Sequence, residues 1–112
     1  MSPITTHILD TSKGLPAKGM NVVLYQQENN NWKEVGKGTT NDDGRATDLL
    51  QGETQISFGV YKLKFDTKSY FEELSVQAFY PFVEIVFEVK DHRHHHVPLL
   101  LNPYGYSTYR GS

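Results

Sequence analysis

Apolar and polar residues alternate along much of this chain. The clearest case is residues 60–66, where Tyr61, Leu63 and Phe65 fall on one side of an extended backbone and two lysines fall on the other. This period of two is typical of a strand with one face in a core and one face in solvent. Residues 83–89 alternate in the same way. We therefore predict a half-buried strand in each segment.

Segments rich in β-branched and aromatic residues predict further strands, separated by turn-forming residues. These strands are expected at residues 5–10, 20–26, 32–40, 46–50, 94–101 and 104–109. The second and third of them flank an asparagine run and should form a hairpin. Asn41 to Gly44 is another turn signal, because Asp-Gly supplies the positive φ of a tight reversal. Residues 51–53 are expected to form a connection.

Residues 67–74 are the one helical candidate, with Thr67 or Ser69 as its N-cap. Eight short strands at intervals of about ten residues, with one short helix, predict an all-β sandwich of a single domain over residues 1–112. A small sandwich must cover its edge strands. Pairing of edges across a two-fold axis would cover them economically.

Composition narrows the function classes. The chain has a formal net charge of -2, which argues against a nucleic acid or an anionic membrane as its main partner. It has no cysteine, which excludes disulfides, zinc–thiolate sites and thiol nucleophiles. No window approaches the roughly 18 apolar residues of a membrane span. We expect a soluble, cytoplasmic protein, unless a leader has been removed.

Histidine and arginine are the candidate catalytic residues. His7 lies in the first predicted strand, Arg45 follows the Asp-Gly turn, and four of the five histidines lie between residues 92 and 96. Because side chains two apart on a strand share a face, His94 and His96 should point together and His95 away.

Three chemical interpretations of these residues remain open. Histidines 92, 94 and 96 could bind zinc if all three share a face. The cluster could instead be a polar strand with solvated imidazoles. In the third interpretation the imidazoles and Arg45 converge on a pocket for metal-free hydrolysis of a small anionic heterocycle. Arg45 would then bind an oxyanion, and a histidine would take a proton from water.

Several motifs resemble those of the transthyretin-like family, and within it the 5-hydroxyisourate hydrolases. The resemblance runs from end to end. It rests on Thr6-His7-Ile8-Leu9-Asp10, Gly14-Leu15-Pro16-Ala17, Thr40-Asn41-Asp42-Asp43-Gly44-Arg45, Phe79-Tyr80-Pro81-Phe82-Val83-Glu84-Ile85, His96-Val97-Pro98-Leu99-Leu100-Leu101 and the ending Tyr109-Arg110-Gly111-Ser112. That ending is the most specific feature, since the hormone carrier transthyretin lacks it. His95 is a departure, because the family commonly has tyrosine there.

The resemblance implies an eight-stranded prealbumin-like sandwich that assembles as a homotetramer, a dimer of dimers, with active sites at the dimer–dimer interface. It implies hydrolysis of 5-hydroxyisourate to 2-oxo-4-hydroxy-4-carboxy-5-ureidoimidazoline without a cofactor or a metal. Its implied site residues are catalytic His7, Arg45 and His96, with Tyr109, Arg110, Gly111 and Ser112 joining His7 and Arg45 in substrate binding.

Two questions stay open at this stage. Either His7 or His96 could be the general base. A carrier that holds a small aromatic ligand in the channel of a tetramer is the alternative function, and it would favour a more apolar site.

Overall fold

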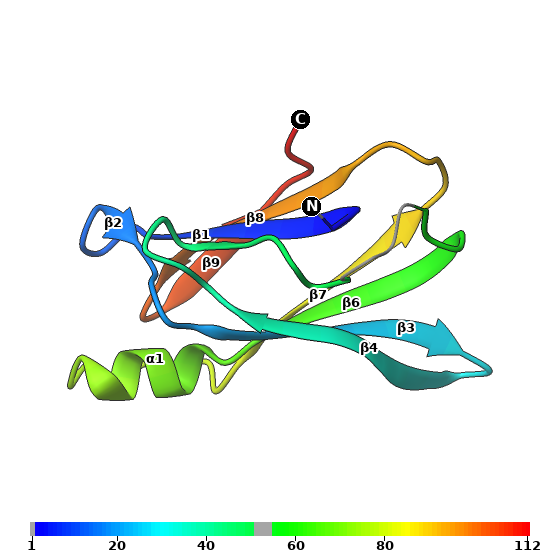
Figure 1. The fold of residues 1–112 in the computed structure, drawn as a ribbon. Helices are drawn as coiled ribbons and strands as arrows, with labels where there is room; N and C mark the ends of the chain where they lie inside the picture. Colours follow the sequence, from blue (N-terminus) through cyan, green and yellow to red (C-terminus); the bar gives the residue numbers. More distant parts are fainter. Residues whose placement is uncertain (1, 51–54) are drawn as a thin grey trace.

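The computed structural model describes residues 2–50 and 55–112, which form two stacked β-sheets and one helix (Figure 1). The predicted connection at residues 51–53 lies outside the described residues. In chain order the elements are β1 (Ile4–Asp10), β2 (Leu15–Pro16), β3 (Asn21–Glu28), β4 (Asn31–Thr39), β5 (Arg45–Ala46), β6 (Gly59–Phe65), α1 (Thr67–Glu73), β7 (Val83–Val89), β8 (His95–Asn102) and β9 (Gly105–Thr108).

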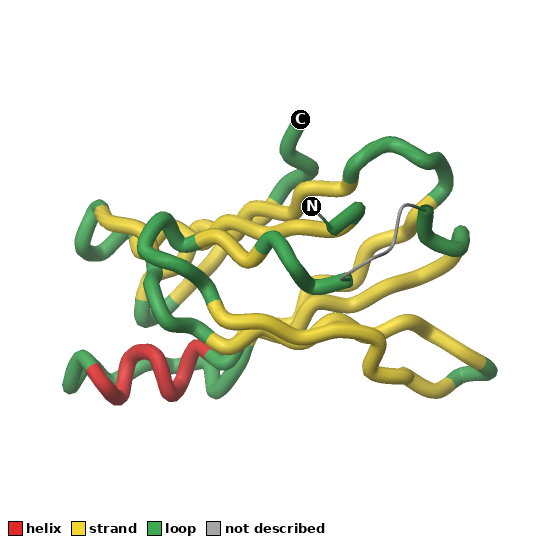
Figure 2. The backbone as a smooth tube through the Cα atoms, viewed as in Figure 1, coloured by secondary structure: helices red, strands yellow, loops and turns green. Residues whose placement is uncertain are grey.

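The first sheet has the strand order β2-β1-β8-β9, with β5 also paired to β1, and the second has the order β4-β3-β6-β7. Figure 2 shows the two layers, with α1 at one end beside the second sheet. Strands β1 and β8 run parallel, with Thr5 opposite His96 and His7 opposite Pro98. The two ends of the sequence therefore lie side by side in one sheet.

The hydrophobic core fills the space between the two sheets. The predicted inward residues of β6, Tyr61, Leu63 and Phe65, are buried there, and the alternation of β7 is also confirmed, with Val83 and Val89 fully buried at its ends. Strands β1 and β8 bury alternate side chains in the same core. Their other side chains face outward. This outer face of the first sheet carries the candidate catalytic residues His7 and His96.

The predicted sandwich and its helix are confirmed, but several local details differ. The N-cap of α1 is Asp66, whose side chain accepts a hydrogen bond from the Ser69 backbone N–H at 3.3 Å, and not Thr67 or Ser69. An aspartate carboxylate at this position satisfies an otherwise unpaired N–H of the first turn.

The nine described strands exceed the predicted eight because of β2, a two-residue strand that pairs with β1 between the predicted strands. The strand predicted at residues 46–50 is replaced by β5, which also pairs with β1 and ends at Ala46. Beyond Ala46 the chain bonds to the N-terminal segment, with the Ser2 N–H donating to the Thr47 carbonyl at 3.0 Å and the Leu50 N–H donating to the Ser2 hydroxyl at 3.1 Å. These isolated bonds replace a strand ladder.

Candidate active site

His7, Arg45 and His96 lie on the outer face of the first sheet, on three different strands. His7 on β1 pairs in register with Arg45 on β5, so their side chains leave the sheet on the same side. On the other side of His7, the His96 ring of β8 lies with its centroid 6.5 Å from the His7 ring. Three residues remote in sequence are thus brought together.

The turn before Arg45 fixes its position beside His7. Gly44 has a φ of 75°, and its N–H donates to the Asn41 carbonyl at 2.9 Å. The Gly44 carbonyl accepts a hydrogen bond from the Ile8 N–H at 2.8 Å, which docks the turn on β1. A Cβ at residue 44 would lie 2.5 Å from the Ile8 carbonyl oxygen. Glycine is therefore required both by the backbone conformation and by the close approach.

A threonine that the sequence patterns did not single out joins this cluster. Thr5 is 2% exposed, and its Oγ1 lies 2.8 Å from Nε2 of His94 and 2.7 Å from Nδ1 of His96. The rings of His94 and His96 are 6.1 Å apart, so the predicted common face of these two histidines is confirmed. Because Thr5 occupies Nδ1, Nε2 is the nitrogen of His96 that is left for other partners.

The surroundings of His96 favour its neutral form. Burial lowers the pKa of His96 below its ordinary value of 6.5, and the positive charge of Arg45 lowers it further. His94 and His7 act in the same direction. A neutral imidazole retains a lone pair that can accept a proton near neutral pH.

The C-terminal tail folds back along β8 (Figure 1). The Gly111 N–H donates to the His96 carbonyl at 2.8 Å, and a Cβ on Gly111 would lie 2.7 Å from Cδ2 of His96. The tail therefore packs directly against the imidazole. Tyr109 lies one residue beyond β9 with its side chain largely exposed, and Ser112 is exposed at the end of the chain.

Arg110 is directed elsewhere. Its guanidinium lies 3.6 Å from the Asp91 carboxylate, next to His95, on the side of β8 opposite to His96. Of the expected substrate-binding residues of the tail, Gly111 contacts His96, whereas the charged end of Arg110 is held at Asp91.

His95 points into the molecule, as the alternation predicted. It is 3% exposed, and both ring nitrogens lack a hydrogen-bond partner. Asp91 lies 3.8 Å from Nε2, beyond hydrogen-bonding distance. Burial, followed by the charge of Arg110, lowers the pKa of His95. A small cavity of about 200 Å³ adjoins it between β7 and the tail.

The zinc interpretation needed His92, His94 and His96 on one face, and His92 does not join the other two. His92 precedes β8 and packs against Phe58, with ring centroids 4.8 Å apart. Within residues 2–50 and 55–112, no group of three or more His, Asp or Glu side chains is arranged to hold a metal ion. In the same part of the chain, no helix is long and apolar enough to cross a membrane.

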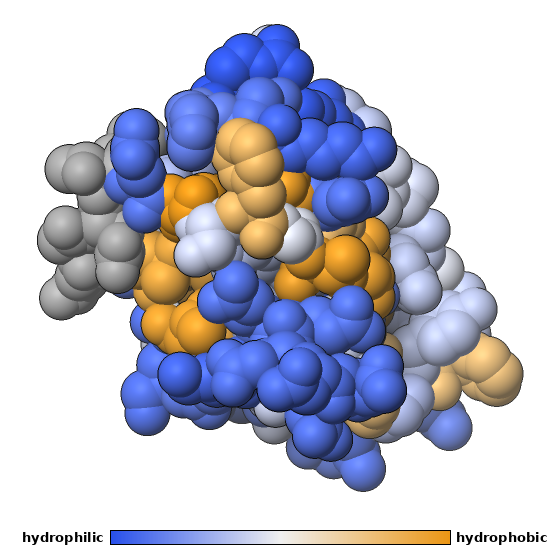
Figure 3. Space-filling view, turned by 90° about the vertical axis from the view of Figure 1, so that its right-hand side faces the viewer, coloured by the Kyte–Doolittle hydropathy of each residue, from blue (hydrophilic) through white to orange (hydrophobic). Residues whose placement is uncertain are grey.

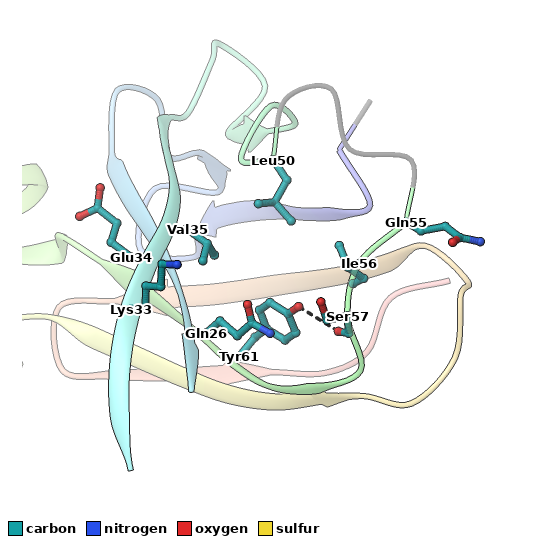
Figure 4. Close-up of a pocket in the computed structure, with 9 residues that line it drawn as sticks. All are labelled: Gln26, Lys33, Glu34, Val35, Leu50, Gln55, Ile56, Ser57 and Tyr61. Carbon is teal, nitrogen blue, oxygen red and sulfur yellow. Dashed lines mark hydrogen bonds between the residues drawn. The ribbon is translucent and has the colours of Figure 1, made fainter. Parts of the chain in front are cut away.

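A larger cavity, of about 390 Å³, opens at one end of the sandwich between β3, β4, β6 and the segment at residues 55–57. Figure 3 shows hydrophobic surface at this end between two polar bands. In the close-up, Leu50, Val35 and Ile56 point inward, and the Tyr61 hydroxyl donates to the Ser57 carbonyl at 2.9 Å (Figure 4). The cavity is lined by neither a histidine nor an arginine. It is therefore a poorer candidate for hydrolytic chemistry than the outer face of the first sheet.

Comparisons with known proteins agree with this fold and with the sequence motifs. A mouse 5-hydroxyisourate hydrolase is 49% identical over 114 residues, covering 99% of this chain and 96% of that protein. Klebsiella pneumoniae 5-hydroxyisourate hydrolase superposes with a TM-score of 0.85 at 32% identity, covering 97% of this chain and 92% of the other. Sea bream transthyretin in complex with thyroxine superposes with a TM-score of 0.91 at 33% identity, covering 98% of this chain and 95% of the other. The model of the HIUase/Transthyretin family matches residues 4–111, and the chain belongs to this family.

Proposed function

We propose that this protein is an enzyme of urate degradation that hydrolyses 5-hydroxyisourate. The reaction opens the amide of the six-membered ring and gives 2-oxo-4-hydroxy-4-carboxy-5-ureidoimidazoline. The observation that carries the proposal is the convergence of His7, Arg45 and His96 on one outer face, with the pKa of His96 lowered by its surroundings. The hydrolase names of the mouse and Klebsiella relatives support the same substrate.

His96 is the general base in this mechanism. Its Nε2 takes a proton from water while the water oxygen attacks the amide carbonyl carbon. Arg45 binds the anionic ring and stabilises the negative charge that develops on the carbonyl oxygen. When the carbon–nitrogen bond breaks, the leaving nitrogen takes a proton either directly from the His96 imidazolium or from His7, which then regains a proton from His96, so that both histidines end as they began. The hydroxyl group of the water thus ends in the new carboxyl group and its other proton ends in the new N–H. No metal takes part.

The tail and a neighbouring subunit complete the pocket. Arg45 and Tyr109 are exposed in the single chain, so the histidine cluster is open on its outer side. In a homotetramer built as a dimer of dimers, a second outer face would cover it. Tyr109 and Ser112 would then close the pocket and hydrogen-bond the substrate, and a dissociated protomer would be inactive.

A carrier function is the second candidate, favoured by the close superposition on the thyroxine complex of sea bream transthyretin. A carrier site is mostly apolar. The three histidines and the arginine on the outer face of the first sheet make a polar pocket here. This polarity favours the enzyme.

The test is to follow the absorbance decay of freshly generated 5-hydroxyisourate with and without the protein. His96→Ala and His7→Ala should each slow hydrolysis by about 10²–10⁴ and still fold, since a positioned acid or base typically contributes that factor. His92→Ala is the matched control and should keep full activity, because His92 lies against Phe58 away from the cluster.

Removal of residues 109–112 separates the two candidates. The truncated protein should lose hydrolysis if the tail completes an active site, whereas a carrier would be little changed. Activity at full rate without the tail, or in His96→Ala, would remove those residues from the mechanism. Activity that disappears with a chelator would overturn the metal-free reaction.

A further inference from the structure

The hydroxyl of Thr5 lies between two imidazoles, and this contact limits the protonation pattern of His96. Thr5 faces His96 directly across the parallel β1–β8 ladder, and His94 lies two residues earlier on the same face. Both contacts are short, at 2.8 Å to His94 and 2.7 Å to His96. With Thr5 only 2% exposed, its hydroxyl is sheltered from water.

A hydroxyl group carries one proton, so it can donate to only one of the two rings. The other ring must then donate its own N–H to the hydroxyl oxygen. In one pattern Thr5 donates to Nε2 of His94 and accepts from the Nδ1–H of His96. In the opposite pattern the Nε2–H of His94 donates to Thr5, and Thr5 donates to Nδ1 of His96. The tautomers of the two histidines are therefore coupled through one side chain.

The two patterns have opposite consequences for Nε2 of His96. In the first, Nδ1 carries the hydrogen and Nε2 presents a lone pair. In the second, a neutral His96 carries its hydrogen on Nε2 and cannot accept a proton there. Only the first pattern provides a base at the nitrogen that Thr5 leaves free.

We propose that Thr5 and His94 are positioning residues that hold His96 in its Nδ1–H tautomer. This inference rests on the proposed role of His96 as the general base. The same pattern also suits the reaction as it proceeds. When Nε2 takes the proton from water, the imidazolium donates from Nδ1 to an oxygen that already accepts that bond, so no hydroxyl has to rotate.

The protonation pattern can be measured directly by NMR. In protein labelled with ¹⁵N at the histidine rings, the ring nitrogen shifts distinguish the two tautomers without any substrate. His96 should be in the Nδ1–H form in the native protein and in Thr5→Ser, which keeps the hydroxyl. Thr5→Val has nearly the same shape without the hydroxyl, and should lose the single tautomer.

Kinetics give the second measurement. Thr5→Val should lower kcat by about 10–100-fold, the loss typical when a partner that orients a functional histidine is removed. KM should stay within about twofold, because Thr5 is not proposed to touch the substrate, and Thr5→Ser should restore most of kcat. A merely structural threonine would instead change the melting temperature and leave the His96 tautomer unaltered.

His94→Phe tests the same inference without altering a buried position, since His94 is exposed. Without an acceptor at residue 94, Thr5 is free to donate to His96, so the Nε2–H form should increase and kcat should fall. An Nε2–H tautomer in the native protein, or full kcat in either Thr5→Val or His94→Phe, would overturn the inference. If His96→Ala is inactive while Thr5→Val is fully active, the proposed function stands and only this inference fails.

Discussion

Gly111→Ala is expected to damage catalysis by displacing His96. The new Cβ would lie 2.7 Å from Cδ2 of His96 and 3.3 Å from Cγ of Pro98. Carbon atoms in contact prefer separations of about 3.5–4.0 Å. One of the two groups must therefore move by about 1 Å, and a misplacement of that size can cost about 10²-fold in rate. Residue 111 is not among the residues with positive φ, so alanine adds no backbone strain there.

The assay is steady-state hydrolysis of 5-hydroxyisourate, with the melting temperature measured in parallel. Gly105→Ala in the same hairpin is the matched control, since its Cβ would meet only side-chain atoms of Asn102 at 3.8 Å, an ordinary contact. We expect kcat/KM to fall by about 10²-fold in the first variant and to change little in the control. If Gly111→Ala keeps kcat/KM within twofold of the native value, the reasoning that the tail positions His96 is refuted.

Three further predictions concern pH and stability. His95→Phe removes two unpartnered ring nitrogens and should stabilise the fold by about 1 kcal/mol or more in urea unfolding. Because the pKa of His95 is lowered in the folded state, residue 95 gains a proton more readily in the unfolded chain as the pH falls below 6.5. The free energy of unfolding of the native protein should therefore decrease below that pH. In His95→Phe this decrease should be less steep. Arg45→Gln removes a positive charge that lowers the pKa of His96, so this pKa should rise. The acidic limb of the pH profile of kcat/KM should then move to higher pH. An acidic limb at unchanged pH would contradict the role of His96 as the general base. Tyr70→Phe, which loses a 2.8 Å bond to the buried Asp10 carboxylate, should cost about 1–2 kcal/mol and leave turnover unchanged.

Local patterns predicted the strands well where each strand has one buried face. The alternation of β6 and β7 was sufficient because burial, with period two, sets both their conformation and their inward residues. The β3–β4 hairpin was also predictable, since Asn29 and Asn30 have the positive φ values of 51° and 68° that its tight turn requires. The opposite orientations of His95 and His96 follow from the same alternation.

The grouping of the candidate site could not be derived from periodicity. It depends on the parallel pairing of β1 with β8 and on the two-residue strand that places Arg45 beside His7. Periodicity does not identify strand partners, so family motifs were needed to connect these residues. Thr5 was missed because a threonine in a strand is ordinary; its position two residues before His7, on the same face, was the only available signal.

The pairing of β1 with β8 also has a consequence for folding in the cell. The bond between Thr5 and His96 joins residues separated by 91 positions, so the outer face of the first sheet cannot form until β8 has been synthesised. Contacts this distant in sequence have a high loop-closure entropy and tend to form slowly. The second sheet, whose hairpin partners are nearer in sequence, can form earlier. A nascent chain that has not yet emerged as far as β8 would therefore carry a partial sandwich without the histidine cluster.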